Sequence, residues 1–359
     1  MSKSLQVLTL TVSIALAVFY VFVWLAHDPR DNDFAAFYSG AVLWERNERA
    51  YDQAKVCQIQ SQIPVKLCLP FFHPPVLLPL LSLASDDDYQ RSYRRWIVGL
   101  LIVLVCCAIP LCQLTKSVVH SLTLIVFLPM LFGFLQGQDS LFVLFGLLCF
   151  AWLLRSGKDV LAGVCLSLTT LRPTLAIALG VPLFFANRRA FWSFFVAGLA
   201  LTLYSLALVG PRGFQDLVTA LLTGAQSDPT TRPDRMYSVT GALVWLGVDE
   251  RWTWLLFIAS SPAVTLLWVK QRLTISTFGA AIVIAVFASP HLHAHDLVFL
   301  IIPLLAWPSF AVLLASFGFM VSLNFRFSHF FVYCLMVGLV TTLRLMQFRT
   351  NADEIDQRI

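Results

Sequence analysis

The sequence has little charge for its length. Only 13% of its 359 residues are Asp, Glu, Lys or Arg, whereas 58% are hydrophobic, and a soluble domain carries roughly 25% charged residues. A chain this apolar has too few polar side chains to cover a single water-soluble globule, so a soluble globular protein is excluded. Intrinsic disorder is also excluded, because disordered segments have low hydrophobicity. The net charge of +5 is spread along the chain rather than clustered, which excludes an ordinary nucleic-acid binder.

The eight cysteines form no metal-binding pattern. Cys106, Cys107 and Cys112 lie within an apolar run, where cysteine packs as a small hydrophobic residue. Cys57 and Cys68 share one polar segment, and they pair only if that segment faces an oxidising compartment. The sequence leaves this pairing open.

Long uncharged runs are abundant. Leu5–Ala26 has 22 residues without a charge and no small-residue cleavage site, so it predicts a retained first span. The pattern predicts an all-α polytopic integral membrane protein, a single domain over residues 1–359 with about 10–12 spans, some of them broken or half-crossing. Further candidate spans are Leu69–Ala84, Trp96–Gln113, Ser121–Leu135, Ser140–Leu154, Val160–Ala186, Phe191–Gly210, Trp252–Val269, Leu273–Ala288, Leu297–Trp307, Ser309–Phe325 and His329–Met346.

Basic residues in short loops set the expected orientation, because such loops stay in the cytoplasm. This rule puts both termini inside, and it puts residues 27–68, 211–251 and 289–296 outside. The first of these outer segments is long enough to fold as amphipathic helices. The basic residues used are Arg91, Arg94, Arg95, Arg188, Arg189, Lys270, Arg272 and Arg349.

Residues 121–186 allow two topologies. If all three candidate spans there cross fully, Arg155 and Lys158 lie outside. If some form half-crossing hairpins, those two residues return to the cytoplasm, and Gln136–Asp139 and Arg172 approach the outer face.

One polar residue, Asp33, follows the first span, and another, His73, lies near the start of the second apolar run. Asp33 lies where a carboxylate serves either as a general base for an incoming hydroxyl or as the N-cap of the next helix. His73 precedes Pro74 and Pro75, which fix an extended chain entry. His73 is therefore either a polar contact in a cavity wall or part of a simple helix start.

Two further groups lie within apolar sequence. Gly137-Gln138-Asp139 separates two apolar segments of about 15 residues each, shorter than the roughly 20 needed to cross. Arg172 precedes Pro173 in the middle of a 27-residue apolar stretch. An intramembrane arginine costs at least about 2.5–3.5 kcal/mol. The scarcity of carboxylates nearby favours an anionic ligand for Arg172, and the alternative is an ion pair with Asp139 or Asp159.

Three of the seven histidines lie together at His291, His293 and His295, followed by Asp296. Alternating histidines suggest a metal site, but no second carboxylate cluster is nearby in the sequence, so no metal is expected. The other two interpretations are phosphate or sugar contact, and a helix start with Asp296 as N-cap.

Taken in order, these features resemble the polyprenol-phosphate-sugar-dependent glycosyltransferases of family 87, which have the GT-C type membrane fold. The resemblance covers Leu5 to Asp296. Two positions depart from the family pattern: His73 replaces a usual Tyr, and Asp139 stands where a small amide residue is more usual. The matching motifs are Asp33-Phe34-Ala35-Ala36-Phe37-Tyr38, Tyr51-Asp52, Phe72-His73-Pro74-Pro75, Gly137-Gln138, Arg172-Pro173, Arg188-Arg189 and Ser289-Pro290 with His295.

The resemblance implies an integral membrane transferase that moves a sugar, most often mannose, from a polyprenyl phosphate to an acceptor hydroxyl with inversion. Asp33 is then the general base, and Arg172 and His295 contact the donor phosphate. The donor is a membrane lipid, the acceptor a glycan, glycolipid or lipid, and no cofactor is expected. The expected location is the bacterial inner membrane with the active site facing outward. The substrate cavity is predicted to include Asp31, Tyr38, His73, Gln138, His291, His293 and Asp296.

Two other classes of protein remain open. A transporter or flippase also uses broken helices and an intramembrane arginine, but such proteins often show paired hydropathy halves, and none is visible here. A polymerase-like or ligase-like envelope enzyme also uses polyprenyl donors. Its active loop normally lies late in the chain, whereas here the acidic site follows the first span.

Overall fold

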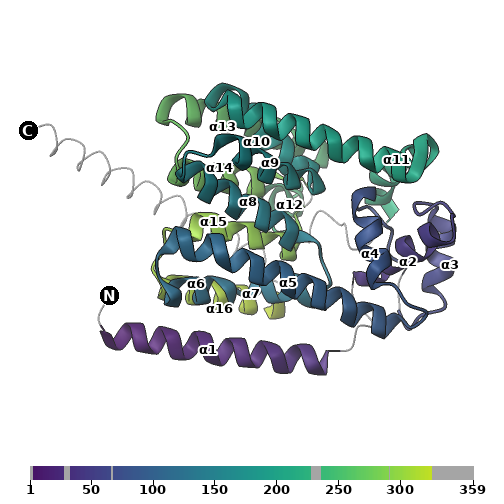
Figure 1. Ribbon diagram of the computed structural model, residues 1–359, viewed down its shortest axis with the longest axis horizontal. Helices are drawn as coiled ribbons and strands as arrows, with labels where there is room; N and C mark the ends of the chain where they lie inside the picture. The colour runs from purple at the N-terminus through teal and green to yellow at the C-terminus, as the bar shows by residue number, and fades with distance from the viewer. Residues whose placement is uncertain (1–2, 28–32, 66–67, 228–235, 291, 326–359) are drawn as a thin grey trace, which may run out of the picture.

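The structure is a computed structural model that describes residues 3–27, 33–65, 68–227, 236–290 and 292–325. Within those ranges it is helical and has no strand, which confirms the expected all-α membrane fold (Figure 1). The α-helices are α1 (Lys3–Ala26), α2 (Phe34–Glu45), α3 (Gln53–Gln60), α4 (Leu78–Ala84), α5 (Tyr89–Thr115), α6 (Val118–Ile125), α7 (Leu128–Leu135), α8 (Ser140–Arg155), α9 (Asp159–Leu166), α10 (Pro173–Ala186), α11 (Arg188–Ser227), α12 (Val239–Trp245), α13 (Glu250–Gln271), α14 (Ile275–Ala288), α15 (Ile301–Leu304) and α16 (Ser309–Phe325). The 3-10 helices are η2 (Pro75–Leu77), η3 (Ser167–Leu171) and η6 (Ala294–Leu300).

Three of the described helices, α1, α5 and α11, are long and apolar enough to cross a bilayer. The pair α6 and α7 forms a fourth span if it is counted as one, with a bend of 46° at the break. Helix α13 has 22 residues, whereas the further apolar helices of 10–17 residues are shorter than the roughly 20 residues of a straight crossing. Backbone breaks at membrane depth are tolerated only where protein or a cavity surrounds them, so the short helices point to an internal site.

Local sequence explains where several helices begin and end. The Asp88 side chain accepts a hydrogen bond from the backbone of Arg91 at the start of α5, and Ser117 does the same for His120 in α6. Thr274 opens α14 with a reciprocal capping box. Pro173 occupies the first position of α10, so the run that began at α9 stops at Arg172 and restarts.

The short helices form three hairpins that begin and end at the same side of the molecule (Figure 1). The first pairs α6–α7 with α8, the second pairs α9–η3 with α10, and the third pairs α14 with η6–α15. Arg155, at the end of α8, donates to the carbonyl of Leu114 near the end of α5. His120, at the start of α6, contacts the Leu305 carbonyl beyond α15.

The hairpins favour the second of the two topologies for residues 121–186. The break at Arg172 was expected from Pro173, and it is the tip of the second hairpin. The turn Gln136–Asp139 is the tip of the first hairpin. Both tips therefore lie away from Arg155 and Lys158, as the hairpin alternative predicts.

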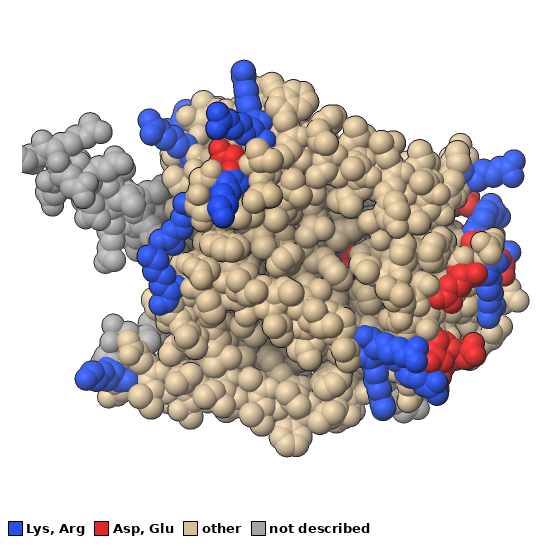
Figure 2. Space-filling model, viewed as in Figure 1, with Lys and Arg blue, Asp and Glu red and all other residues tan. Residues whose placement is uncertain are grey.

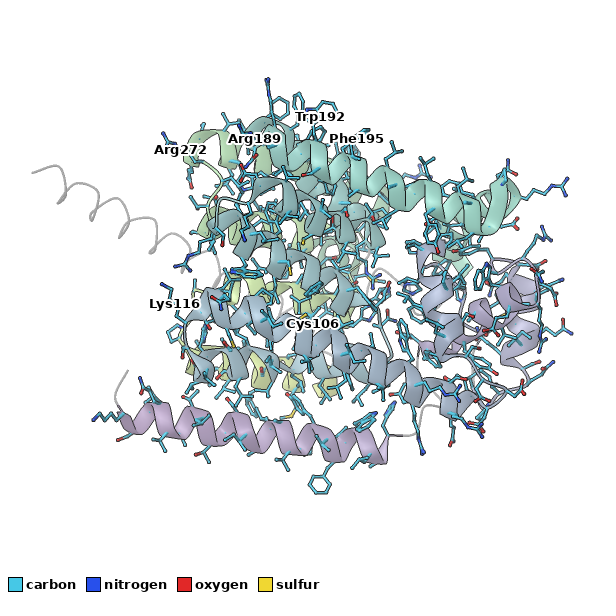
Figure 3. The ribbon with its side chains drawn as sticks, in the orientation of Figure 1. Cys106, Lys116, Arg189, Trp192, Phe195 and Arg272 are labelled. Carbon is cyan, nitrogen blue, oxygen red and sulfur yellow. A yellow bond between two sulfur atoms is a disulfide. The ribbon has the colours of Figure 1, made fainter. Side chains whose placement is uncertain are left out.

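Charged side chains gather at the two ends of the molecule, with a broad uncharged band between them (Figure 2). Lys116, Arg189 and Arg272 lie at one end (Figure 3), which we call the basic end. Helices α2, α3 and α4 and the start of α5 form the opposite end, which we call the lobe end. Such an uncharged band is what a bilayer core requires of the surface it surrounds. Between α11 and α5 the band is hollowed, with acidic atoms visible at the floor.

Two predictions about the start of the chain are wrong. Leu69–Ala84 is not a crossing span, because its helix α4 has only 7 residues, about 10 Å of length. The chain therefore does not change sides before α5, and Arg91 and Arg95 stay at the lobe end, where both pair with Asp86. These arginines were expected on the side opposite residues 27–68.

The lobe is cross-linked. A disulfide joins Cys57 and Cys68, with the sulfur atoms 2.03 Å apart, and this confirms the pairing that the sequence left open. The Gln60 side-chain amide bonds both the carbonyl and the N–H of Leu69. These contacts fix the segment that leads into Phe71 and His73.

The second expected outer segment is partly helical. Helix α11 continues from Arg188 to Ser227 through a break at Gly210, whose φ of 69° suits glycine. Its later part reaches the lobe, where Asp216 lies 3.4 Å from Arg49. The candidate span His329–Met346 lies outside the described residues.

Candidate functional site

The site begins with Asp33, which immediately precedes α2. Its carboxylate lies at the N-cap position without a capping hydrogen bond to the described helix. Instead it accepts a hydrogen bond of 2.6 Å from the side-chain amide of Gln138. The side chain is 37% exposed. Asp33 therefore occupies the expected N-cap position, but its side chain does not cap α2, and the carboxylate is accessible.

The turn at the tip of the first hairpin supplies the next two groups. Gly137 has a φ of +70°, which a glycine adopts freely, and its carbonyl accepts from the Trp96 indole. This turn presents Gln138 to Asp33 and turns Asp139 inward, where it is completely buried. The Oε1 atom of Gln138 is buried and has no hydrogen-bond partner among the described residues.

Arg172, at the tip of the second hairpin, contacts two buried carboxylates. Its Nη2 lies 2.8 Å from Asp139 and its Nε 3.0 Å from Asp296. Nη2 also donates to the Ser140 hydroxyl, and Nη1 donates to the Leu171 carbonyl. The expectation that almost no carboxylate is available to Arg172 is therefore wrong. The ion pair with Asp139 is present, and its second partner is Asp296 rather than Asp159.

The tip of the third hairpin brings His295 and Asp296. His295 is buried, with Nδ1 4.0 Å from Asp33 and Nε2 3.7 Å from Asp296. Asp296 also accepts from the Ser140 hydroxyl and lies in the first turn of η6, whose N-cap is His293. The N-cap interpretation of Asp296 is thus wrong. His293 stacks on His295, with ring centroids 5.3 Å apart.

His73 joins this cluster from the lobe. Its Nδ1 lies 3.1 Å from Asp139, and its ring packs 4.0 Å from that of Phe37. The Tyr51 hydroxyl donates to the His73 carbonyl. His73 and Asp139, which lie far apart in the sequence, therefore contact each other.

The contacts close into a ring, which we call the polar ring. Asp33 contacts His295, His295 contacts Asp296, and Asp296 contacts Arg172. Arg172 contacts Asp139, whose neighbour Gln138 returns to Asp33. The ring ties the start of α2 to the tips of all three hairpins, so it holds Asp33 against otherwise separate elements.

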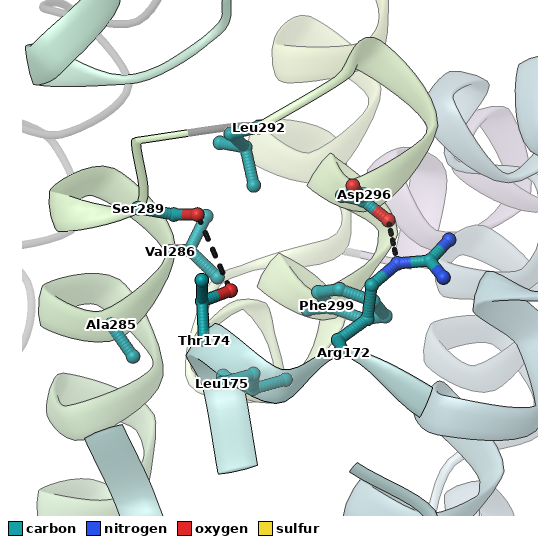
Figure 4. Close-up of a pocket in the computed structure, with 9 residues that line it drawn as sticks. All are labelled: Arg172, Thr174, Leu175, Ala285, Val286, Ser289, Leu292, Asp296 and Phe299. Carbon is teal, nitrogen blue, oxygen red and sulfur yellow. Dashed lines mark hydrogen bonds and ion pairs between the residues drawn. The ribbon is translucent and has the colours of Figure 1, made fainter. Parts of the chain in front are cut away.

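A small pocket opens beside the ring (Figure 4). Arg172, Thr174, Ser289 and Asp296 form its polar part, and the other lining residues are apolar. Thr174 and Ser289 approach within 3.5 Å through their hydroxyls. Thr174 belongs to the first turn of α10, where backbone N–H groups favour negative charge.

The structure does not bring every predicted residue to the ring. Tyr38 is buried in the lobe, where its hydroxyl donates to the Asp86 carbonyl and its ring packs against Tyr89. Asp31 and His291 lie outside the described residues. The expectation of no metal stays a prediction.

Two residues in the site were missed from the sequence. Ser140 bridges Arg172 and Asp296, and the Gln136 side chain accepts from the backbone N–H of Asp33. Both flank Gly137-Gln138-Asp139. The available signal was the polar run Gln136–Ser140 between two short apolar segments, and the sequence prediction rested only on its centre, Gly137-Gln138-Asp139.

Comparisons with known proteins give one match. A family model described as glycosyltransferase family 87 matches residues 71–292, more than half of the chain. No curated protein and no solved structure matches significantly. The matched region includes His73, Gln138, Asp139, Arg172 and Ser289, but it begins after Asp33 and stops before His295.

Proposed function

Because the chain belongs to glycosyltransferase family 87, we propose that it transfers mannose from a polyprenyl phosphate to an acceptor hydroxyl, with Asp33 as general base. The protein is an integral membrane glycosyltransferase; the donor, the sugar and the base belong to the proposal. One observation carries the proposal. The Asp33 carboxylate is accessible, yet Gln138 holds it by a hydrogen bond at the meeting point of three hairpin tips, where His295 lies 4.0 Å away.

The chemistry is a single displacement. The acceptor oxygen forms a bond to the anomeric carbon, and its proton passes to an oxygen of Asp33. The bond between the anomeric carbon and the phosphate oxygen breaks, and its electron pair stays on the lipid phosphate. One base and one in-line attack give inversion at the anomeric carbon.

The donor phosphate is assigned to Arg172 and His295 in this proposal. The polar side of the pocket has Arg172 with its partner Asp296, two hydroxyl groups and the start of α10, and apolar side chains lie elsewhere. That combination suits an anionic head group on a lipid chain. Each Arg172 nitrogen already has a protein acceptor, so a phosphate must share Arg172 with the ring rather than meet a free guanidinium.

In this proposal the protein lies in a bacterial inner membrane, with its lobe end outside the cytoplasm. Lys116, Arg189 and Arg272 at the basic end support this orientation, because basic loops are retained in the cytoplasm. The disulfide between Cys57 and Cys68 supports it independently, since disulfides persist in oxidising compartments.

The proposal is tested with purified full-length protein and radiolabelled polyprenyl phosphate mannose, using methyl α-D-mannopyranoside as surrogate acceptor. The arabinose and glucose analogues serve as donor controls. We expect label to move to the water-soluble glycoside from the mannose donor. In liposomes, donor that crosses the bilayer with its sugar still attached would instead indicate a transporter.

A further inference from the structure

His73 and Asp139 form a pair that the transfer chemistry at Asp33 does not use. The His73 Nδ1 lies 3.1 Å from an oxygen of the buried Asp139 carboxylate. An ionised carboxylate only accepts hydrogen bonds, so Nδ1 carries the proton and donates it to Asp139. In the neutral imidazole, Nε2 is then the acceptor, as in other histidines oriented by a carboxylate.

The imidazole is fixed from three directions. Its ring packs against Phe37, which is itself fully buried, with centroids 4.0 Å apart. The Tyr51 hydroxyl holds the His73 backbone carbonyl at 2.7 Å. Asp139 holds the ring edge, and Arg172 in turn holds Asp139. The His73 side chain keeps 17% of its surface exposed. A ring held this firmly presents one defined acceptor to a ligand.

Adjacent residues of one turn contact His73 and the base Asp33. Gln138 contacts Asp33 and Asp139 contacts His73, and the Cα atoms of two consecutive residues are only about 3.8 Å apart. One turn therefore holds both side chains, Asp33 through Gln138 and His73 through Asp139.

The charges indicate what kind of ligand fits. Asp33 and Asp139 place two carboxylates on this side, whereas the positive charge of Arg172 is shared between Asp139 and Asp296. An anionic ligand is disfavoured beside these two carboxylates. A neutral group that donates a hydrogen bond to Nε2 is favoured, and sugar hydroxyls are such groups.

We infer that the His73–Asp139 pair is an acceptor-recognition site, in which His73 Nε2 accepts a hydrogen bond from a second hydroxyl of a neutral, polyhydroxylated acceptor. Asp139 is the positioning residue and His73 the contact. This inference rests on the proposed function, because it assumes that the first hydroxyl of the same acceptor lies at Asp33.

The test measures binding, so it does not depend on transfer. Methyl α-D-mannopyranoside is titrated into the full-length protein in lipid nanodiscs and followed by saturation-transfer difference NMR, with mannose 1-phosphate as the anionic probe. His73→Asn keeps a donor toward Asp139 but removes the acceptor at Nε2. His73→Gln restores a polar group near Nε2. His120→Asn, at the basic end, is the matched control.

We expect His73→Asn to weaken methyl mannoside binding about tenfold, the effect of one lost hydrogen bond. His73→Gln should stay within about threefold of the wild type, and His120→Asn should not change binding. The inference is overturned if His73→Asn binds like the wild type, if the glutamine variant loses as much as the asparagine variant, or if wild-type protein shows no methyl mannoside signal. It is also overturned if only mannose 1-phosphate responds to His73→Asn. Loss of mannosyl transfer with intact, His73-dependent binding would count against the proposed function alone.

Discussion

Arg172 and Asp139 lie 2.8 Å apart at the tips of two neighbouring hairpins, and Asp139 is fully buried. The pair joins a turn that follows α7 to a helix break that precedes α10. Each partner alone is costly within an apolar bundle, and Arg172 offsets the charge of Asp139 and of Asp296. Removing one partner of a buried pair leaves an uncompensated charge, which costs more than the pair contributes.

Arg172→Ala should therefore destabilise the protein by about 3–5 kcal/mol, because Asp139 and Asp296 lose their counter-charge. Denaturant unfolding in detergent micelles, followed by tryptophan fluorescence, measures the change. Arg155→Ala is the control, because Arg155 lies on the surface at the far end of α8. Equal stabilities of the two variants would show that the Arg172 contacts contribute little.

A charge exchange separates the structural role of Arg172 from its proposed phosphate contact. Arg172→Asp combined with Asp139→Arg rebuilds one ion pair but moves the guanidinium away from the pocket beside α10. We expect the double variant to regain stability relative to Arg172→Asp alone and to remain inactive in transfer. Recovery of transfer in the double variant would end the phosphate assignment of Arg172.

Much of this architecture follows from local sequence, and the exceptions have physical reasons. Pro173 predicts the break at Arg172, and the short apolar segments around Gly137 predict a hairpin. The carboxylates that neutralise Arg172 come from residues 139 and 296, and no local pattern reports such a distant pairing. Asp139 and Asp296 each adjoin an apolar run, but each also fits a turn or helix start.

The predicted side of Arg91 and Arg95 is wrong for a related reason. The rule that places basic loops in the cytoplasm counts crossings, and Leu69–Ala84 was counted as one. Pro74, Pro75 and Pro79 divide that segment, so only the short helix α4 forms. Asp86 then pairs with both arginines at the lobe end, which offsets their charge.

Gln138 is expected to position the base. Gln138→Leu removes the 2.6 Å hydrogen bond to Asp33 but keeps the volume of the side chain. We predict a fall in kcat of about tenfold, in line with one hydrogen bond to a charged group, and little change in the KM for donor. Steady-state kinetics measure both. Gln58→Leu, on an exposed face of α3, should behave like the wild type; an unaltered kcat in Gln138→Leu would remove Gln138 from the mechanism.

The disulfide is expected to stabilise the lobe. Cys57→Ser with Cys68→Ser should lower stability by about 2–3 kcal/mol, the loop-closure value for a cross-link of this span. Thermal unfolding of the double variant measures the loss, and Cys112→Ser is a control at an unpaired, exposed cysteine. Reaction of native Cys57 and Cys68 with maleimide before reduction would contradict the pairing.

Sidedness is tested with single cysteines in a background without native cysteines. Asp87→Cys lies in the loop between α4 and α5 at the lobe end, and Lys116→Cys lies at the basic end. A membrane-impermeant maleimide should label position 87 in intact cells and position 116 only after the cells are opened. The reverse pattern would place the lobe in the cytoplasm.

The most direct test of the whole account is label transfer by Asp33→Asn. The amide keeps the shape of the side chain and can still accept a hydrogen bond from Gln138, but it cannot take the proton of the acceptor. We predict that transfer from radiolabelled polyprenyl phosphate mannose falls by about 10²–10⁴-fold, while stability and donor binding are retained. Asp87→Asn, at an exposed loop carboxylate, should transfer label normally. Wild-type transfer by Asp33→Asn would contradict the central claim that Asp33 is the base.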